Sequence, residues 1–472
     1  MFAGRKEELR LFRQIMQDDR SHFIAVYGRR RVGKTYLIRE AFSYRFTFQH
    51  AGLSDGSLKE QLAAFDASLE DAGQRPSHKS ANWMDAFNQL KDLIRGSGEK
   101  RKVIFIDELS WMDTPRCDLM TALENFWNGW ASARKDIVLI VCASATSWLL
   151  SKVIHNKGGL YNRLTEQIHL RPFTLAECRE YLDLNGFVFN TEQILKGYMI
   201  FGGVPYYWSL LQKGLSLPQN IDRLCFSRDA LLKDEFRYLY ASIFRNAENH
   251  MRIVCTLARK KAGMTREELI ASSGLSNSGD LTLKLEELEV CGFIRKYTAF
   301  GMKKKSAVYQ LIDFFTLFYQ QFMASPPSDE RFWSNRQNTP AVNVWNGLAF
   351  ERVCLEHVPQ LKEALGISGV LTEVHSWYCS ADPEKGIFGS QIDLMLVRAD
   401  QIINLCEMKY SATEFSVTEK TEQSIRRKIH DLTVRTGTRN AIHPILVTVY
   451  GITDSPHSAI FQHVITAEAL FR

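Results

Sequence analysis

The chain has 472 residues, of which 45% are hydrophobic and 24% are charged, and its formal net charge is +6. At about 150 residues per domain, this length predicts about three domains. The composition excludes wholesale disorder and fibrous proteins. The apolar runs are far shorter than the roughly 18 residues of a membrane span, and charges near the start argue against a signal peptide. The net charge permits nucleic-acid binding but equally describes an ordinary mixed-charge surface.

The nine cysteines are scattered along the chain and form no C-x-x-C pair. Neither a zinc ribbon nor a disulfide framework is therefore indicated. We expect reduced thiols, a cytoplasmic protein and no membrane partner.

The first 170 residues alternate short apolar runs with amphipathic stretches. The runs predict strands at 23–27, 46–50, 103–106, 137–142 and 167–170, and the stretches between them predict helices at 57–72, 82–95 and 116–131. Such alternation is typical of an α/β fold, with a mostly parallel sheet covered by helices. We assign residues 1–173 to this domain.

Helical patterns follow over 174–235, interrupted by Gly202-Gly203-Val204-Pro205. Residues 236–323 then predict a helix–turn–helix, with a helix over 279–290, followed by two strands at 293–297 and 307–311. This order is the winged-helix arrangement. The candidate recognition helix carries Asp280, Lys284, Glu286, Glu287 and Glu289 and is net acidic, which favours a structural or protein-contacting role over DNA reading. Lys303, Lys304 and Lys305 at the hairpin tip either touch phosphates or are simply solvated.

Proline and serine mark residues 324–341 as a linker. The remaining segment, 342–472, predicts a small α/β domain with helices at 342–358 and 420–432. Its predicted strands lie at 370–375, 391–397, 402–408 and 445–449.

The first motif lies between the strand at 23–27 and a helix predicted over 35–42, and it fits G-x-x-x-x-G-K-[ST]. Its residues are Gly28, Arg29, Arg30, Arg31, Val32, Gly33, Lys34 and Thr35. Glycines let backbone N–H groups cradle the phosphates of ATP, and the helix N-terminus adds partial positive charge. Lys34 is expected to neutralise the β- and γ-phosphates, and the Thr35 hydroxyl to bind Mg²⁺.

Polar residues at the ends of two other strands complete the predicted ATP site. Asp107 would hold Mg²⁺ through water, and Glu108 would polarise the attacking water. Ser144, after the strand at 137–142, is either a sensor of the γ-phosphate or a helix N-cap. Arg163 either reaches the transition-state charge of a neighbouring subunit in a homo-oligomer or is a surface arginine.

These residues resemble the prokaryotic P-loop ATPases related to AAA+ and STAND proteins, of the archaeal type. The family opens with F-x-G-R-x-x-E-L, which here runs from Phe2 to Leu9, and carries G-R-R-x-x-G-K-T and a later G-G-x-P. The resemblance implies ATP hydrolysis and a helical lid in which Pro205 contacts the nucleotide base. The sequence departs from the family at Ala143, where glycine is more usual before the serine.

A second constellation lies near the C-terminus. Asp393 interrupts an apolar strand, and Glu407 and Lys409 end the next one. Two carboxylates can hold Mg²⁺ and a lysine beside them can position water, which suits phosphodiester hydrolysis. The pattern is short, and surface salt bridges at a sheet edge are the alternative. The flanking helices add Glu351 before the strands and Gln423 after them.

This segment resembles the PD-(D/E)XK nuclease superfamily, through Gln391-Ile392-Asp393 and Cys406-Glu407-Met408-Lys409-Tyr410, although Ile392 replaces the proline. The resemblance implies a site of Asp393, Glu407 and Lys409, assisted by Glu351. We therefore predict an ATPase coupled to a Mg²⁺-dependent nuclease that acts on nucleic acid, with DNA favoured over RNA as the substrate. The alternative is a nucleotide-controlled switch that oligomerises and binds a partner without cleavage. A transcription regulator is the weakest hypothesis, because of the acidic helix.

Overall fold

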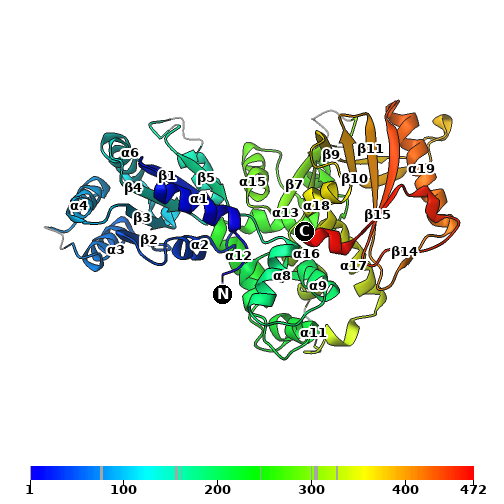
Figure 1. The fold of residues 1–472 in the computed structure, drawn as a ribbon, viewed down its shortest axis with the longest axis horizontal. Coiled ribbons are helices and arrows are strands. Elements are labelled where there is room, and N and C mark those ends of the chain that lie inside the picture. Colours follow the sequence, from blue (N-terminus) through cyan, green and yellow to red (C-terminus); the bar gives the residue numbers. More distant parts are fainter. Residues whose placement is uncertain are drawn as a thin grey trace. The chain divides into compact units, whose positions relative to one another are not determined.

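A computed structural model describes residues 2–74, 78–154, 158–160, 162–244, 246–298, 300–301, 307–325 and 328–472 (Figure 1). The chain forms two compact units. The first consists chiefly of Phe2–Pro172, and the second chiefly of Phe173–Ser242 and Asn246–Arg472. Each unit is described by itself.

The first unit is built on a five-stranded parallel sheet in the order β2-β3-β4-β1-β5. Its strands are β1 (His22–Tyr27), β2 (Phe48–Ala51), β3 (Lys102–Asp107), β4 (Ile137–Cys142) and β5 (Glu166–His169). Every residue of β3 and β4 is buried, as expected for central parallel strands that have helices on both faces. The predicted α/β fold with a parallel sheet is thus confirmed.

Helices cover both faces of this sheet. They are α1 (Lys6–Gln17), α2 (Lys34–Ala41), α3 (Leu58–Asp71), α4 (Trp83–Gly96), α5 (Leu109–Met112), α6 (Leu119–Gly129) and α7 (Thr146–Leu149). Alternate residues of β1 enter two different cores: Phe23 packs with α3, α4 and α6, whereas Ile24 packs with α1 and α2. Because all these strands are parallel, their carboxyl ends lie at one edge of the sheet, where the P-loop and Asp107 are placed.

The second unit begins with helices and a small antiparallel sheet. The helices are α8 (Leu175–Leu184), α9 (Thr191–Phe201), α10 (Pro205–Ser209), α11 (Leu217–Ile221), α12 (Glu235–Ile243), α13 (Glu248–Leu257), α14 (Arg266–Ser273) and α15 (Gly279–Val290). The sheet has the order β6-β8-β7 and consists of β6 (Met264–Thr265), β7 (Ile294–Thr298) and β8 (Ala307–Leu311). Lys303, Lys304 and Lys305 lie outside the described residues.

The segment predicted as a linker does not run free where the structure describes it. After α16 (Phe314–Phe318), Phe332 and Trp333 are buried, and their rings pack with Phe318 and Phe322. The backbone N–H of Trp333 donates to Asp222 Oδ1 at 2.7 Å. The proline and serine content signals a turn, but two large apolar rings in the same segment are stabilised by burial.

The C-terminal part contains a mixed five-stranded sheet in the order β15-β13-β11-β10-β9. The strands are β9 (Thr372–Cys379), β10 (Ser390–Arg398), β11 (Ile402–Lys409), β13 (Ala441–Thr448) and β15 (His463–Thr466). Strands β9, β10 and β11 pair antiparallel, whereas β11, β13 and β15 pair parallel. Helix α19 (Glu419–Thr436) makes the crossover that a parallel pair requires. Two short strands, β12 (Phe415–Ser416) and β14 (Ile452–Thr453), pair separately.

The helix predicted over 342–358 corresponds to one helix, whose bounds differ from the prediction by two residues at each end. Helix α17 (Pro340–Glu356) ends at the C-cap His357, and α18 (Val358–Ala364) begins directly afterwards. Pro359 lies in the first turn of α18, where its missing N–H costs nothing, whereas it would break the interior of a continuous helix.

One hydrophobic core joins the helical segment after Phe173 to the C-terminal sheet. It includes residues of α8 and α9, of α17 and of strands β11 and β13. The backbone N–H of Leu175 donates to His357 Nε2 at 3.1 Å, and Arg179 pairs with Glu468 at 2.6 Å. The helices that follow the ATPase core are therefore packed into the same body as the C-terminal sheet.

Within the described ranges, no helix combines the length and the apolar character needed to cross a membrane.

Candidate functional site

The P-loop runs from the end of β1 to the start of α2, with glycines where the backbone requires them. Gly28 has φ +144°, and a Cβ there would lie 2.2 Å from the backbone oxygen of Leu170. Gly33 has φ +89° directly before Lys34, the first residue of α2. Both glycines thus allow the loop to fold under the N-terminus of α2, where free backbone N–H groups favour phosphate.

The Lys34 ammonium lies across this loop. Its Nζ donates to the carbonyl oxygens of Gly28 at 2.8 Å and of Arg29 at 3.1 Å. Arg29 is buried, Arg30 and Arg31 are half-buried, and Val32 is in the core beside α2. The loop residues predicted to bind ATP therefore form one local structure, with the lysine held where phosphate oxygens would replace the two carbonyls.

Thr35 and Asp107 meet at the edge of the sheet. Thr35 Oγ1 donates to Asp107 Oδ2 at 2.6 Å, and Asp107 Oδ1 accepts from the Glu108 backbone N–H at 2.9 Å. A hydroxyl and a carboxylate are the hard oxygen donors that Mg²⁺ prefers. The two side chains fit the predicted metal role, and they would hold the ion beside the phosphates.

Glu108 is held by Ser144. Its carboxylate accepts from the Ser144 backbone N–H at 2.9 Å and from the Ser144 hydroxyl. The N-cap position of α7 is occupied by Ala145, which makes no side-chain capping hydrogen bond. The alternative that Ser144 is the N-cap of this helix is therefore wrong. The serine hydroxyl is engaged instead by the acid predicted to polarise water. Glu108 itself has φ +48°, an uncommon conformation for a side-chain-bearing residue.

Arg163 and Pro205 remain outside this geometry. Arg163 is exposed. Pro205 opens α10 in the other compact unit, so its contact with the base stays a prediction. The adjacent Gly203 has a packing role: a Cβ there would lie 1.8 Å from the Phe173 oxygen.

The acids and the lysine predicted near the C-terminus line one cavity of about 440 Å³. Asp393 comes from β10, Glu407 and Lys409 from β11, and Glu351 from α17. A β-bulge lies at Asp393, because Ile392 pairs with Trp377 but Met395 pairs with His375. Bulges redirect side chains and recur beside active sites. The Ser376 hydroxyl donates to the Asp393 carbonyl at 2.6 Å and so satisfies the bulged backbone.

Every acid in this cavity has a donor partner. Glu407 is bound by Lys409 Nζ at 2.8 Å and by Lys428 Nζ at 2.7 Å, and Glu351 is bound by Lys261 at 2.6 Å. Asp393 Oδ1 accepts from the Gln391 amide at 2.7 Å. The charges of Glu407 and Glu351 are thereby compensated by lysines in a partly buried site, whereas Asp393 is hydrogen-bonded to a neutral amide.

The pKa shifts agree with this pairing. Burial alone would raise the pKa of Glu407, but Lys428 and then Lys409 outweigh it and lower that pKa. Burial would lower the pKa of Lys409, and the negative charge of Glu407 raises it instead. The pKa of Glu351 is raised, first by burial and then by the charge of Asp393. The site therefore holds a charged Glu407–Lys409 pair and an acid of weakened acidity.

The cavity is suited to a phosphate and, in donor type, to Mg²⁺. Its lining carries four cations, Lys261, Lys409, Arg427 and Lys428, against three acids. Within the described part of the chain, no group of three His, Cys, Asp or Glu side chains is arranged to hold a metal ion. Oxygen donors are present, but lysines take both Glu407 oxygens. A cation at Asp393 and Glu407 would have to displace a lysine.

Sequence reasoning missed Lys428 and named Gln423 instead. Gln423 donates to Glu419 at 2.9 Å and does not line the cavity. Lys428, a little over one turn further along α19, reaches Glu407. Its only signal was a lysine in the helix after the E-x-K strand, and only the packing of α19 on the sheet shows which residue faces the site.

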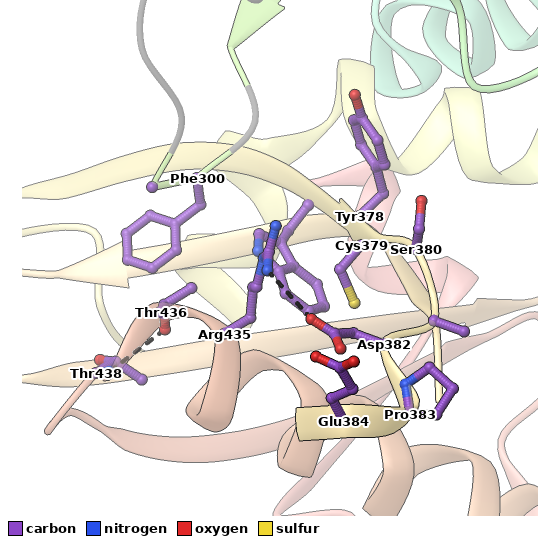
Figure 2. Close-up of a pocket in the computed structure, with 13 residues that line it drawn as sticks. Phe300, Tyr378, Cys379, Ser380, Asp382, Pro383, Glu384, Arg435, Thr436 and Thr438 are labelled. Carbon is purple, nitrogen blue, oxygen red and sulfur yellow. Dashed lines mark hydrogen bonds and ion pairs between the residues drawn. The ribbon is translucent and has the colours of Figure 1, made fainter. Parts of the chain in front are cut away.

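A second cavity, of about 710 Å³, opens between β9, the end of α19 and the residues Phe300 and Gly301 (Figure 2). Phe300, Trp377 and Tyr378 contribute aromatic rings, and Arg435 lies 3.9 Å from Asp382. No motif in the sequence pointed to this cavity, because its lining comes from three separate segments.

Comparison with known proteins identifies the N-terminal part. Residues 2–211 match the model of a family described as an ATPase domain predominantly from Archaea. This part of the chain is an ATPase domain of the archaeal type. The match confirms the prediction of an ATP-binding P-loop domain and supports ATP hydrolysis, which typically uses a divalent metal.

One relative matches most of the chain and another matches a short segment of it. The uncharacterized protein MJECL04 of Methanocaldococcus jannaschii is 24% identical over 435 residues, which span 91% of this chain and 92% of that protein. The uncharacterized ATP-binding protein MJ0423 of the same organism is 48% identical over 40 residues, 8% of this chain and 68% of that protein.

Two solved structures match about two thirds of this chain at low sequence identity. The Walker-type ATPase paby2304 of Pyrococcus abyssi matches with TM-score 0.48 and 14% identity, covering 68% of this chain and 96% of that one. The ORC2 protein of Aeropyrum pernix matches with TM-score 0.42 and 12% identity, covering 67% of this chain and 90% of that one. At these values neither likeness specifies a function.

Proposed function

We propose that the protein couples ATP hydrolysis to Mg²⁺-dependent cleavage of nucleic acid, with DNA as the favoured substrate. In this proposal residues 1–173 are the ATPase core, 174–235 a helical lid and 236–323 a winged-helix domain. A connecting segment, 324–341, leads to a PD-(D/E)XK nuclease-like domain at 342–472. The observation that carries it is that Asp393, Glu407, Lys409 and Glu351, from three elements, line one cavity with an excess of cations.

The cavity residues suit attack on a phosphodiester. Lys409 and Lys428 would neutralise the charge of the phosphate, and Asp393 and Glu407 would hold the divalent cation. Such an ion supplies an activated water and stabilises the charge that develops on the phosphate. Lys409, paired with Glu407, would orient that water.

The shared core supports coupling between the two activities. Helices α8 and α9 follow the ATPase core in the chain and belong to the same hydrophobic core as β11, which carries Glu407 and Lys409. A nucleotide-driven movement of these helices would therefore carry the C-terminal site with it.

The test is cleavage of labelled DNA and RNA by the full chain with Mg²⁺ and ATP. Lys409→Ala should abolish cleavage and keep ATP hydrolysis, whereas Lys34→Ala should lose ATP hydrolysis. Lys420→Ala, on the exposed start of α19, is the matched lysine control. Equal cleavage by wild type and Lys409→Ala refutes the nuclease proposal.

The second candidate is a nucleotide-controlled switch that binds a partner without cleaving anything. Two observations favour it: lysines hold both Glu407 oxygens, and α15 exposes Asp280 and Glu286 where a DNA reader would present cations. An ATP-dependent change in molar mass by light scattering, reduced by Arg163→Ala and without any cleavage, would support it. An unchanged monomer with and without ATP would refute it.

A further inference from the structure

The cavity of the acids and the cavity of Figure 2 are connected by two segments of the chain. Helix α19 contributes Arg427 and Lys428 to the first cavity and Arg435 to the second. From Lys428 to Arg435 is seven residues, or about 10 Å along a helix. The connection from β9 to β10 likewise lines the second cavity at its start and the first at its end. A single extended ligand can therefore reach both.

This β9–β10 connection is fixed in place. Asp431 of α19 is fully buried, and its carboxylate accepts from the Phe388 backbone N–H at 3.0 Å and from the Ser390 hydroxyl at 2.5 Å. Asp382 and Ile387 close the loop through two backbone hydrogen bonds of 2.9 Å. The backbone around Phe388 is thus held rigidly against the helix.

Phe388 nevertheless exposes 61% of its surface. The Arg427 guanidinium lies 5.5 Å from the centre of its ring, and the His430 ring lies 6.0 Å away. Keeping a fixed aromatic ring exposed to water costs free energy. Such a ring, with an arginine beside it, is a surface on which a nucleobase stacks.

The second cavity has the opposite charge balance from the first. Its lining holds one cation, Arg435, against the carboxylates of Asp382 and Glu384, with threonine hydroxyls at positions 436 and 438 (Figure 2). Phe300 contributes a ring and is tied to β9 by its backbone N–H, which donates to the Ser376 oxygen at 3.1 Å. This lining disfavours a phosphate. It matches a base, because carboxylates accept from exocyclic amino groups and arginine donates to ring nitrogens and carbonyls.

We infer that this face of the C-terminal part binds single-stranded nucleic acid. The backbone phosphates lie on Arg427 and Lys428, one base stacks on Phe388, and an unpaired base enters the cavity of Figure 2. A duplex is disfavoured because paired bases are stacked inside the helix and cannot enter a side cavity. The inference rests on the proposed function, whose substrate class it narrows.

The experiment measures binding of labelled 12-nucleotide single-stranded DNA, single-stranded RNA and the matching DNA duplex by fluorescence anisotropy. The full chain is used with EDTA, so that nothing is cleaved. Single strands should bind at least tenfold more tightly than duplex. Phe388→Ala, Phe300→Ala and Arg435→Ala should each weaken single-strand binding about tenfold, as expected for loss of one stacked or contacted base. Tyr238→Ala, an exposed ring in the same compact unit, is the control and should bind like wild type.

Equal or tighter binding of duplex, or wild-type binding by both phenylalanine variants, overturns the inference. A preference between the two single strands identifies DNA or RNA as the ligand, and equal binding supports single strands of both kinds. Because binding is measured without Mg²⁺, absence of cleavage would refute the nuclease proposal alone. Cleavage of duplex without single-strand preference would refute this inference alone.

Discussion

Lys428 decides how readily a divalent cation reaches Glu407. Glu407 is largely buried, and its two oxygens are bound by Lys409 at 2.8 Å and by Lys428 at 2.7 Å. Lys409 shares strand β11 with Glu407, whereas Lys428 approaches from α19 and is mostly covered. Any metal ion that uses this carboxylate competes with these ammonium groups. We therefore expect Lys428→Ala to bind divalent cations more tightly than wild type.

The magnitude follows from one lost charge-assisted hydrogen bond. Such a bond contributes about 1.5–3 kcal/mol, and about 1.4 kcal/mol corresponds to a tenfold change in affinity. If the ion must break the Lys428 bond to enter, its removal should strengthen binding about 10- to 100-fold. The partial exposure of the pair favours the lower end of this range.

The assay is Mn²⁺ titration of the full chain, followed by electron paramagnetic resonance of the free ion. Glu407→Gln defines the binding that does not involve this carboxylate, including any at the P-loop. Arg426→Ala is the matched control, because Arg426 lies two residues away on α19, is exposed and pairs with Glu422. Equal or weaker Mn²⁺ binding by Lys428→Ala would refute the competition, and so would tighter binding by Arg426→Ala.

Three further predictions concern other parts of the chain. Lys34→Ala should abolish ATP turnover in a phosphate-release assay while leaving the circular dichroism spectrum unchanged, and normal turnover would contradict the P-loop assignment. Gly203→Ala should lower the free energy of unfolding of the second unit, measured in urea, by about 3 kcal/mol or more, because the new Cβ would lie 1.8 Å from the Phe173 oxygen. Gly347→Ala is the control: the new Cβ in α17 meets open space, so this variant should be neutral or slightly stabilising. Burial lowers the pKa of His357 to about 4, so the folded state stays neutral while the unfolded state binds a proton below about pH 6.5. The free energy of unfolding should therefore be highest above pH 6.5 and fall by up to about 3 kcal/mol towards pH 4. His357→Gln should flatten this pH dependence. An unchanged pH dependence in that variant would contradict the role given to His357.

Local and contiguous features were predictable from the residues. The strand at 137–142 and the helix at 279–290 have the predicted bounds, because a buried parallel strand is a continuous apolar run and the helix lies between clear turn signals. The P-loop spans only eight residues, so its chemistry is readable without the fold. Helix α17 (Pro340–Glu356) likewise lies within two residues of the predicted bounds, and α18 begins at Val358 directly after its C-cap.

Features assembled from distant segments were not predictable. Short strands such as β15 carry too few residues to show a period, and the bulge at Asp393 exists only through its pairing with β9. Phe332 and Trp333 lie in the segment predicted as a linker, but they pack into a core formed by other helices. Only the tertiary structure shows that this segment is packed.

The sequence by itself determined the ATPase domain and the residue types of both sites, because these depend on short motifs and on periodic burial. Only the tertiary structure decided that Ser144 engages Glu108, that Lys428 shares Glu407 with Lys409, and that a second cavity adjoins the acids along α19. These contacts join residues 21 to 36 positions apart, or separate segments altogether. Which of these residues come into contact depends on which faces of the helices and strands pack together. The packing of the whole core determines those faces.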